Sequence, residues 1–203
     1  MDAAIKERLR RGAAALEIAL DKSQLAQLDR YLALLLTWNR KINLTAIIEP
    51  AEIVDRHFLD SLAVAPLVDR AATLVDVGSG AGFPGAVLAI ARPTLHVTCV
   101  ESIHKKVAFL QTLRLEIASN LEPVCARAEQ LDRRFDVAIS RATWDPSEWL
   151  AHGAPLVAPG GLLIAMQTAD SPELAAPPGF TREPARDYRI GDRARRLQPF
   201  RHD

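Results

Sequence analysis

A glycine-rich turn follows directly on a short apolar run, and few folds accommodate this combination. The run Thr73–Val77 reads TLVDV, which is typical of a parallel strand buried on both faces. Glycine then occupies positions 78, 80, 82 and 85. Because glycine has no Cβ, such a segment can turn tightly and let a ligand approach its backbone. The pattern predicts a strand, a ligand-binding turn and then the start of a helix.

The same alternation continues along the chain. Four further runs have strand character: 96–100, 122–125, 135–140 and 162–166. A helix beginning near Ser102, its expected N-cap, should separate the first two runs, and another helix is expected around 147–152. This order predicts an α/β fold, a Rossmann-like parallel sheet with helices on both faces.

Two further expectations concern the last third of the chain. Pro159-Gly160-Gly161 is expected to form a turn before the fifth strand, because glycine and proline commonly interrupt regular structure. Residues 180–188 and 195–200 are expected to close the sheet as an antiparallel hairpin, after a proline-rich loop over 170–179.

Residues 1–70 lack strand signals and are expected to form a helical extension to a core at 71–203. Apolar residues recur at helical spacing after Ser23, the expected N-cap, and that helix should end near Trp38 and Asn39, ahead of Asn43. A second helix should start at Pro50, since proline suits the first helical turn.

Composition excludes several classes of protein. The 203 residues carry 25 Lys and Arg against 25 Asp and Glu, so bulk positive charge cannot drive nucleic-acid binding. An apolar content of 49% excludes a disordered chain. The two cysteines, Cys99 and Cys125, suit a reducing cytosol. No metal-ligand spacing, signal peptide or membrane span is found, so we expect a cytoplasmic protein without a metal or a membrane partner.

Two acidic residues narrow the choice of ligand. The spacing Gly80-x-Gly82-x-x-Gly85 also matches the fingerprint of dinucleotide-binding enzymes. Asp76, at the end of the first strand, would repel a pyrophosphate but suits a cationic ligand such as S-adenosylmethionine. Glu101 ends the second strand and can accept the hydroxyls of a ribose, a device that NAD enzymes share. S-adenosylmethionine is therefore the expected cofactor, and NAD stays the alternative.

Four sequence blocks resemble the bacterial ribosomal RNA small subunit methyltransferase G family, also called glucose-inhibited division protein B. The blocks, within residues 31–166, are Trp38-Asn39-x-x-x-Asn43-Leu44-Thr45, Arg56-His57-x-Leu59-Asp60-Ser61, Asp76-Val77-Gly78-Ser79-Gly80-Ala81-Gly82-Phe83-Pro84-Gly85 and Ser140-Arg141-Ala142. The third is common to many methyltransferases, whereas the order and spacing of the others are specific.

The resemblance implies a class I, S-adenosylmethionine-dependent enzyme that methylates N7 of one guanine in the decoding-region loop of 16S rRNA. It implies 16S rRNA or the small ribosomal subunit as the partner, and we expect a monomer without an obligate protein partner. Together with the reasoning above, the expected cofactor contacts are Asp76, Gly78, Gly80, Phe83, Glu101, Ala128, Glu129 and Arg141.

A second set of residues is expected to line the substrate cleft. His57 and Asp60 lie three positions apart and should share a helix face with access to the cleft, near Arg141. A buried His57–Asp60 hydrogen bond is the structural alternative. The expected RNA contacts are Arg56, Trp144, Arg193, Arg195 and Arg196, the last three within a segment, 181–203, that carries a net charge of +3. Trp149 is expected to pack in the core.

The expected chemistry needs no acid–base residue, because N7 of guanine carries a lone pair and no proton. Two alternatives use the same motifs: an NAD-dependent oxidoreductase and a non-catalytic RNA-binding module. The chain also departs from similar proteins beside the expected cleft, with Thr143-Trp144-Asp145-Pro146 after the fourth strand and Gln167-Thr168 after the fifth.

Overall fold

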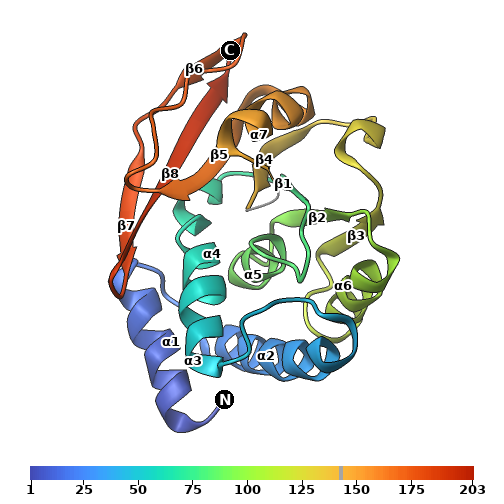
Figure 1. Ribbon diagram of the computed structural model, residues 1–203, viewed down its shortest axis with the longest axis vertical. Helices are drawn as coiled ribbons and strands as arrows, with labels where there is room; N and C mark the ends of the chain where they lie inside the picture. The colour runs from blue at the N-terminus through green and yellow to red at the C-terminus, as the bar shows by residue number, and fades with distance from the viewer. Residues whose placement is uncertain (142–143) are drawn as a thin grey trace.

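The computed structural model describes residues 1–141 and 144–203. A single sheet crosses the molecule, with helices on both sides (Figure 1). Its strand order is β3-β2-β1-β4-β5-β8-β6, and β7 pairs with β8. The strands are β1 (Thr73–Val77), β2 (His96–Glu101), β3 (Leu121–Cys125), β4 (Phe135–Ser140), β5 (Val157–Thr168), β6 (Phe180–Arg182), β7 (Arg186–Ile190) and β8 (Arg193–His202).

Strands β1 to β5 are parallel, and alternate residues along them enter different cores. Leu74 packs with the helical extension on one face, whereas Val75 and Val77 pack with Trp149 on the other face. Because both faces are covered, the strand sequences are mostly apolar, without a strict alternation of polar and apolar residues. The predicted Rossmann-like sheet with helices on both faces is confirmed.

The helices divide between these two cores. Helix α5 (Gly85–Ala91) is buried along its whole length, and it shares one core with α6 (His104–Glu116) and the helical extension. Helix α7 (Pro146–Gly153) covers the opposite face. The predicted cap by Ser102 is wrong: α6 follows Ile103 without a side-chain cap, and Glu101 accepts the Ile103 N–H instead.

The extension is helical as predicted and packs directly against the sheet's own helices. Its elements are α1 (Ala3–Ala15), α2 (Lys22–Ile42), α3 (Pro50–Ile53), the π-helical segment η1 (Val54–Leu59), α4 (Asp60–Leu62) and the 3-10 turn η2 (Ala65–Val68). None of the helices described is long and apolar enough to span a bilayer.

The predicted start of the first long helix is wrong, and its end lies three residues beyond Asn39, although still ahead of Asn43. Asp21 caps α2 in a reciprocal capping box with Gln24, so Ser23 lies inside the helix. The helix also continues past Trp38 and Asn39 to Ile42, where Asn43 adopts φ +50° and ends it. The predicted start at Pro50 is confirmed, with proline in the first turn of α3.

The last third of the chain departs from two details of the prediction. Residues 159–161 are not a turn: they lie within β5, in an irregular stretch where pairing with β4 shifts from Phe135–Val157 to Val137–Leu162. Gly160, with φ +77°, accommodates this irregularity. The predicted hairpin is antiparallel, but two short strands, β6 and β7, pair with β8.

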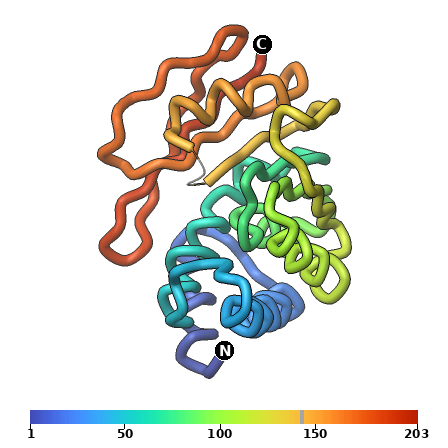
Figure 2. The backbone as a smooth tube through the Cα atoms, turned by 45° about the vertical axis from the view of Figure 1, so that its right-hand side comes forward, coloured from blue at the N-terminus to red at the C-terminus, as the bar shows by residue number. Residues whose placement is uncertain are grey.

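The antiparallel strands extend beyond the parallel sheet toward the helical extension. In the turned view, the β7–β8 turn projects from the sheet edge toward the N-terminal helices (Figure 2). Arg186 at the start of β7 donates a hydrogen bond to the Leu16 carbonyl, just beyond α1. The start of β7 and the segment that follows α1 therefore lie side by side.

Candidate active site

The glycine-rich turn requires glycine at several positions. Gly78, Gly80 and Gly82 adopt φ values of +71°, +58° and +92°, a region that side chains disfavour. The Gly78 amide donates to the Val100 carbonyl over 2.8 Å and so fastens the turn to β2. A Cβ at Gly82 would lie 2.7 Å from the hydroxyl of Tyr31 in α2. The extension therefore packs directly against the turn.

Asp76 lies beneath this turn and is completely buried. Its Oδ2 accepts the Gly85 amide over 2.9 Å at the start of α5. A Cβ at Gly85 would lie 2.8 Å from Oδ2 and 2.7 Å from Sγ of Cys99, so the contact requires glycine. Oδ1 has no hydrogen-bond partner among the described residues. Burial raises the pKa of Asp76 to about 6.

A cavity of about 510 Å³ opens at the carboxyl ends of β1, β2 and β4, where ligands bind in open α/β sheets. We call it the donor pocket. The predicted cofactor residues in its wall are Gly78, Glu101, Ala128, Glu129 and Arg141. Asp76, Gly80 and Phe83 are not part of this wall.

Glu101 is the buried anion of the donor pocket, with 6% of its surface exposed. Its Oε2 accepts the Gly80 amide over 3.0 Å, and its Oε1 accepts the Ile103 amide over 2.9 Å. Lys106 Nζ lies 3.7 Å from Oε2. Each carboxylate oxygen can accept more than one hydrogen bond. Glu101 can thus hold the turn and also bind hydroxyls of a ligand.

Phe83 packs against the helical extension. Its ring stacks on His57, with centroids 4.5 Å apart, and on Tyr31, with centroids 5.4 Å apart. The guanidinium carbon of Arg141 lies 5.2 Å from the centre of the same ring. The ring therefore supports other residues of the site, and a direct contact of Phe83 with the cofactor stays a prediction.

A second cavity, of about 600 Å³, lies between the extension and the start of β8. We call it the substrate cleft. The predicted residues in its wall are Arg56, His57, Asp60, Arg141, Arg193 and Arg195. Among the residues that the structure describes, Arg141 is the one that lines both the donor pocket and the substrate cleft.

Arg141 joins His57 and Asp60, which the sequence placed on one helix face. Its Nη1 donates to the Arg56 carbonyl over 2.7 Å and to Oδ2 of Asp60 over 3.2 Å. Its Nη2 lies 3.0 Å from Nδ1 of His57. Both side chains thus meet the guanidinium, an arrangement that neither sequence interpretation included.

His57 is neutral in this environment. Burial, and next the nearby charge of Arg141, lower its pKa to about 3. Because Arg141 can only donate, Nδ1 of His57 accepts its hydrogen bond. Nε2 then carries the proton and donates to Oγ1 of Thr45 over 3.0 Å. The His57 ring is therefore hydrogen-bonded on both sides and connects Arg141 to Thr45 in the 43–49 loop.

The three arginines of β8 that were predicted to contact RNA do not lie on one surface. Arg193 and Arg195 face the substrate cleft. Arg196 points to the opposite face, because side chains alternate along a strand. There it forms two hydrogen bonds of 2.7 and 2.9 Å with Asp187.

Trp144 lies against the donor pocket, not the substrate cleft. Its ring stacks on Trp149 and on His152. Trp149 is 2% exposed and donates to the Ile164 carbonyl, which confirms the predicted core position.

Gln167, where the sequence departs from similar proteins after the fifth strand, is buried, and its Oε1 has no partner among the described residues. Ala142 and Thr143 lie outside the described residues.

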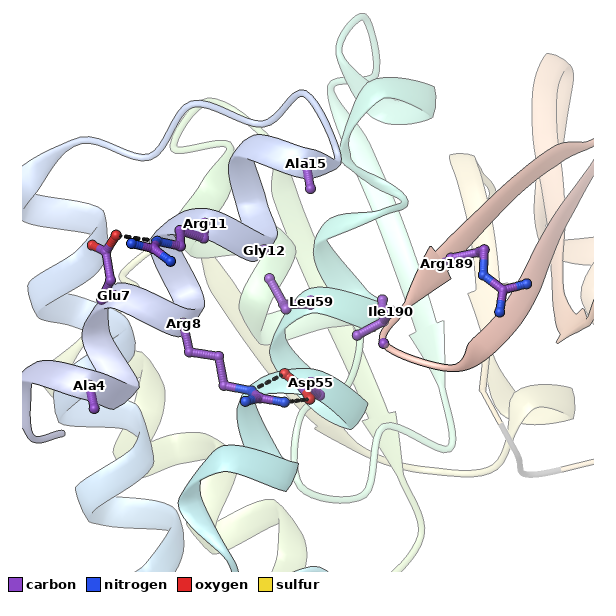
Figure 3. A pocket seen from close by; sticks show the side chains of 11 residues that line it. Ala4, Glu7, Arg8, Arg11, Gly12, Ala15, Asp55, Leu59, Arg189 and Ile190 are labelled. Carbon is purple, nitrogen blue, oxygen red and sulfur yellow. Dashed lines mark hydrogen bonds and ion pairs between the residues drawn. The ribbon is translucent and has the colours of Figure 1, made fainter.

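A third cavity, which the sequence did not indicate, separates α1 from the β7–β8 turn (Figure 3). Two of its arginines pair with carboxylates of the same wall: Arg8 Nε donates to Asp55 over 2.7 Å, and Arg11 Nε donates to Glu7 over 2.6 Å. Arg8 and Asp55 also line the substrate cleft, so the two cavities adjoin.

Comparisons with known proteins identify the family of this chain. The family model described as "rRNA small subunit methyltransferase G" matches residues 24–176. A ribosomal RNA small subunit methyltransferase G from Anaeromyxobacter sp. is 44% identical over 183 residues, covering 87% of this chain and 85% of the relative. Its counterpart from Chromohalobacter salexigens is 43% identical over 202 residues, covering 97% of each chain.

Solved structures support the fold independently. A putative O-methyltransferase from Klebsiella pneumoniae gives a TM-score of 0.63 at 16% identity, covering 98% of this chain and 96% of that one. An O-methyltransferase from Bacillus cereus gives 0.62 at 15% identity, covering 98% and 100%. With the family match spanning both the donor pocket and most of the helical extension, the chain belongs to the rRNA small subunit methyltransferase G family.

Proposed function

We propose that the protein transfers a methyl group from S-adenosylmethionine to N7 of one guanine in 16S rRNA. The observation that carries the proposal is the position of Arg141 in the walls of both the donor pocket and the substrate cleft. A donor in the first cavity and a base in the second would meet at this residue. Residues 1–70 would then supply one wall of the cleft to the core at 71–203.

The donor pocket fits S-adenosylmethionine in chemistry. Glu101 would accept the ribose hydroxyls, and Ala128 with Glu129 would border the adenine. The left-handed backbone at Gly78 leaves room for a close approach. The unpartnered Oδ1 of Asp76, just beneath the turn, adds negative potential that favours a cationic ligand. When bound, S-adenosylmethionine supplies a methyl group on a positively charged sulfur.

The chain need not supply a proton acceptor for this reaction. Guanine N7 attacks through its lone pair, so no proton leaves the base. His57 is neutral, and both of its ring nitrogens are engaged, by Arg141 and by Thr45. Catalysis then rests on holding the base in line with the methyl group.

The substrate cleft supplies the RNA side of the proposal. Arg56, Arg193 and Arg195 place three guanidinium groups in its wall, where they can contact phosphates. An enzyme that modifies a base has to take it out of the stack, and the cleft has room for a base. We propose 16S rRNA or the small ribosomal subunit as the partner of a monomeric, cytoplasmic enzyme.

The test is methyl transfer with the purified protein. Small ribosomal subunits and naked 16S rRNA from cells lacking the enzyme are incubated with S-adenosylmethionine, and nucleosides are identified by mass spectrometry. We expect 7-methylguanosine at a single position. A methyl group on another atom would refute the N7 assignment.

Calorimetric titration separates the alternatives. We expect heat of binding with S-adenosylmethionine and none with NAD. Tight NAD binding would favour an oxidoreductase. RNA binding without affinity for S-adenosylmethionine would favour a non-catalytic module.

A further inference from the structure

The carboxylate of Asp60 is the meeting point of three distant segments. Its Oδ1 accepts the Tyr188 hydroxyl of β7 over 2.7 Å and Nε of Arg195 of β8 over 3.3 Å. Its Oδ2 accepts Nη1 of Arg141, which follows β4. A single side chain of the extension thus connects the end of the parallel sheet to the antiparallel strands.

This cluster is largely withdrawn from water. The exposed side-chain fractions are 6% for Asp60 and 13% for Arg141, and Tyr188 is 8% exposed as a residue. Burial raises the pKa of Tyr188, so its hydroxyl keeps the proton that it donates to Asp60. In a low-dielectric environment, each of these bonds strongly restricts the geometry of its partners.

The cluster restricts the orientation of the Arg141 side chain. An arginine side chain has many rotamers, and a long one at the boundary of two cavities would otherwise sample several orientations. Asp60 holds the guanidinium from one side, His57 from another, and the Phe83 ring lies against it. A cation fixed before the reactants arrive needs no reorganisation during the reaction.

We propose that Asp60 and Tyr188 are positioning residues that orient Arg141 between the donor pocket and the substrate cleft, so that β7 takes part in methyl transfer. The inference rests on the proposed function. It assigns no contact with the reactants to Tyr188, which acts through Asp60 and then Arg141.

The first test replaces Tyr188 with phenylalanine, which removes the hydroxyl and keeps the ring. Misplacement of a positioned group by about 1 Å costs on the order of a hundredfold in rate, so we expect a ten- to hundredfold slower single-turnover methylation with both reactants saturating. Calorimetric affinity for S-adenosylmethionine should change less than the rate, because Glu101 and the glycine-rich turn are untouched, and the melting temperature should fall by only a few degrees, as for the loss of one buried hydrogen bond.

The matched control lies on the same strand. Asp187→Asn removes an ion pair with Arg196 on the outward face of the β7–β8 ladder. We expect this variant to methylate at the unmodified rate. An equal loss of rate in both variants would assign the effect to general loosening of β7 and would overturn the inference.

A spectroscopic readout reports on Arg141 directly, without turnover. In ¹⁵N-labelled protein, the Nε–H resonance of Arg141 is assigned by its loss in Arg141→Lys. We expect Tyr188→Phe to shift or broaden this resonance and Asp187→Asn to leave it unchanged. An unchanged resonance in a slow Tyr188→Phe enzyme would show that the hydroxyl does not act through Arg141.

Asp60→Asn is the second variant, because it keeps the shape of the side chain and removes its charge. It should slow methylation at least as much as Tyr188→Phe and perturb the same resonance. Full activity of either folded variant would overturn the inference. If the unmodified protein forms no 7-methylguanosine, the proposed function fails, whereas the resonance still tests how Arg141 is held.

Discussion

The donor pocket and the substrate cleft are built in different ways. The donor pocket is held by backbone amides of the glycine-rich turn, which donate to the neighbouring strand β2: Gly78 to the Val100 carbonyl and Gly80 to the Glu101 carboxylate. The substrate cleft is held by side chains far apart in sequence. Asp60 meets Arg141, Tyr188 and Arg195 across 81, 128 and 135 positions.

This difference predicts how the two sites respond to mutation. The donor pocket follows from the parallel sheet itself, so changes in it should alter cofactor affinity and leave RNA binding intact. The substrate cleft exists only where the extension and the antiparallel strands meet, so changes there should alter RNA binding or the rate.

The largest effect is expected at Gly78. Gly78→Val places a β-branched side chain at φ +71° in the wall of the donor pocket, so affinity for S-adenosylmethionine should fall by at least about a hundredfold. Gly191→Val is the control, since Gly191 has a similar φ of +61° and a Cβ there meets nothing within 4 Å. Calorimetry should show normal cofactor affinity for the control. An equal loss of S-adenosylmethionine affinity in Gly78→Val and Gly191→Val would show that backbone strain, and not the position in the donor pocket, causes the effect.

The next effect concerns the buried anion of the donor pocket. Glu101→Ala should weaken S-adenosylmethionine binding by roughly 1.5–3 kcal/mol, the range for hydrogen bonds to a charged group. RNA affinity, measured by filter binding, should not change. Loss of RNA affinity together with cofactor affinity would contradict the separation of the two sites.

A smaller effect is expected on the RNA side. Arg193 lines the substrate cleft, whereas Arg196 is paired with Asp187 on the other face. Arg193→Ala should therefore reduce the slope of log affinity against log salt by about 1, the effect of losing one phosphate contact. Arg196→Ala should leave the slope unchanged. The reverse result would place the RNA on the outward face of β8.

The smallest effect is expected in the pH profile. Because the pKa of His57 is lowered to about 3, the residue stays neutral between about pH 6 and 8.5, and single-turnover methylation should be nearly flat across that window. His57→Asn should lower the rate without changing the shape of the profile. A tenfold rise per pH unit near pH 6–7 that vanishes in the variant would identify His57 as a base.

The lowered pKa of His57 also predicts how the stability of the protein depends on pH. An unfolded chain protonates His57 near pH 6.5, whereas the folded protein does so only near pH 3. As the pH falls between these values, the unfolded state gains a proton that the folded state lacks, so stability is lost at up to about 1.4 kcal/mol per pH unit. Denaturant titrations of His57→Asn should show a weaker acid dependence. The pKa of Asp76 is shifted upward, so Asp76 affects the acid dependence in the opposite direction. Because Asp76 is present in both the unmodified protein and His57→Asn, its contribution cancels in the comparison.

The same contrast explains what the sequence could predict. Strands buried on both faces and a glycine turn leave local signals, so the sheet and most of the donor pocket could be predicted. The partners of Asp60 could not, because nothing near Tyr188 marks a residue 128 positions away. Residues 159–161 were misassigned because glycine marks bulges within strands as well as turns. The expected strand over 195–200 already contained Arg195 and Arg196, so the alternation of side chains along a strand, had it been applied, would have placed them on opposite faces.

The position of β8 has a consequence for the order in which the protein can mature during synthesis. β8 pairs with β5, β6 and β7, all of which precede it in the chain. Until the ribosome has translated residues 193–202, β6 and β7 lack their partner strand, and Tyr188 has no ladder to hold it beside Asp60. A nascent chain can therefore form the strands around the donor pocket early, yet it completes the substrate cleft only with this late strand.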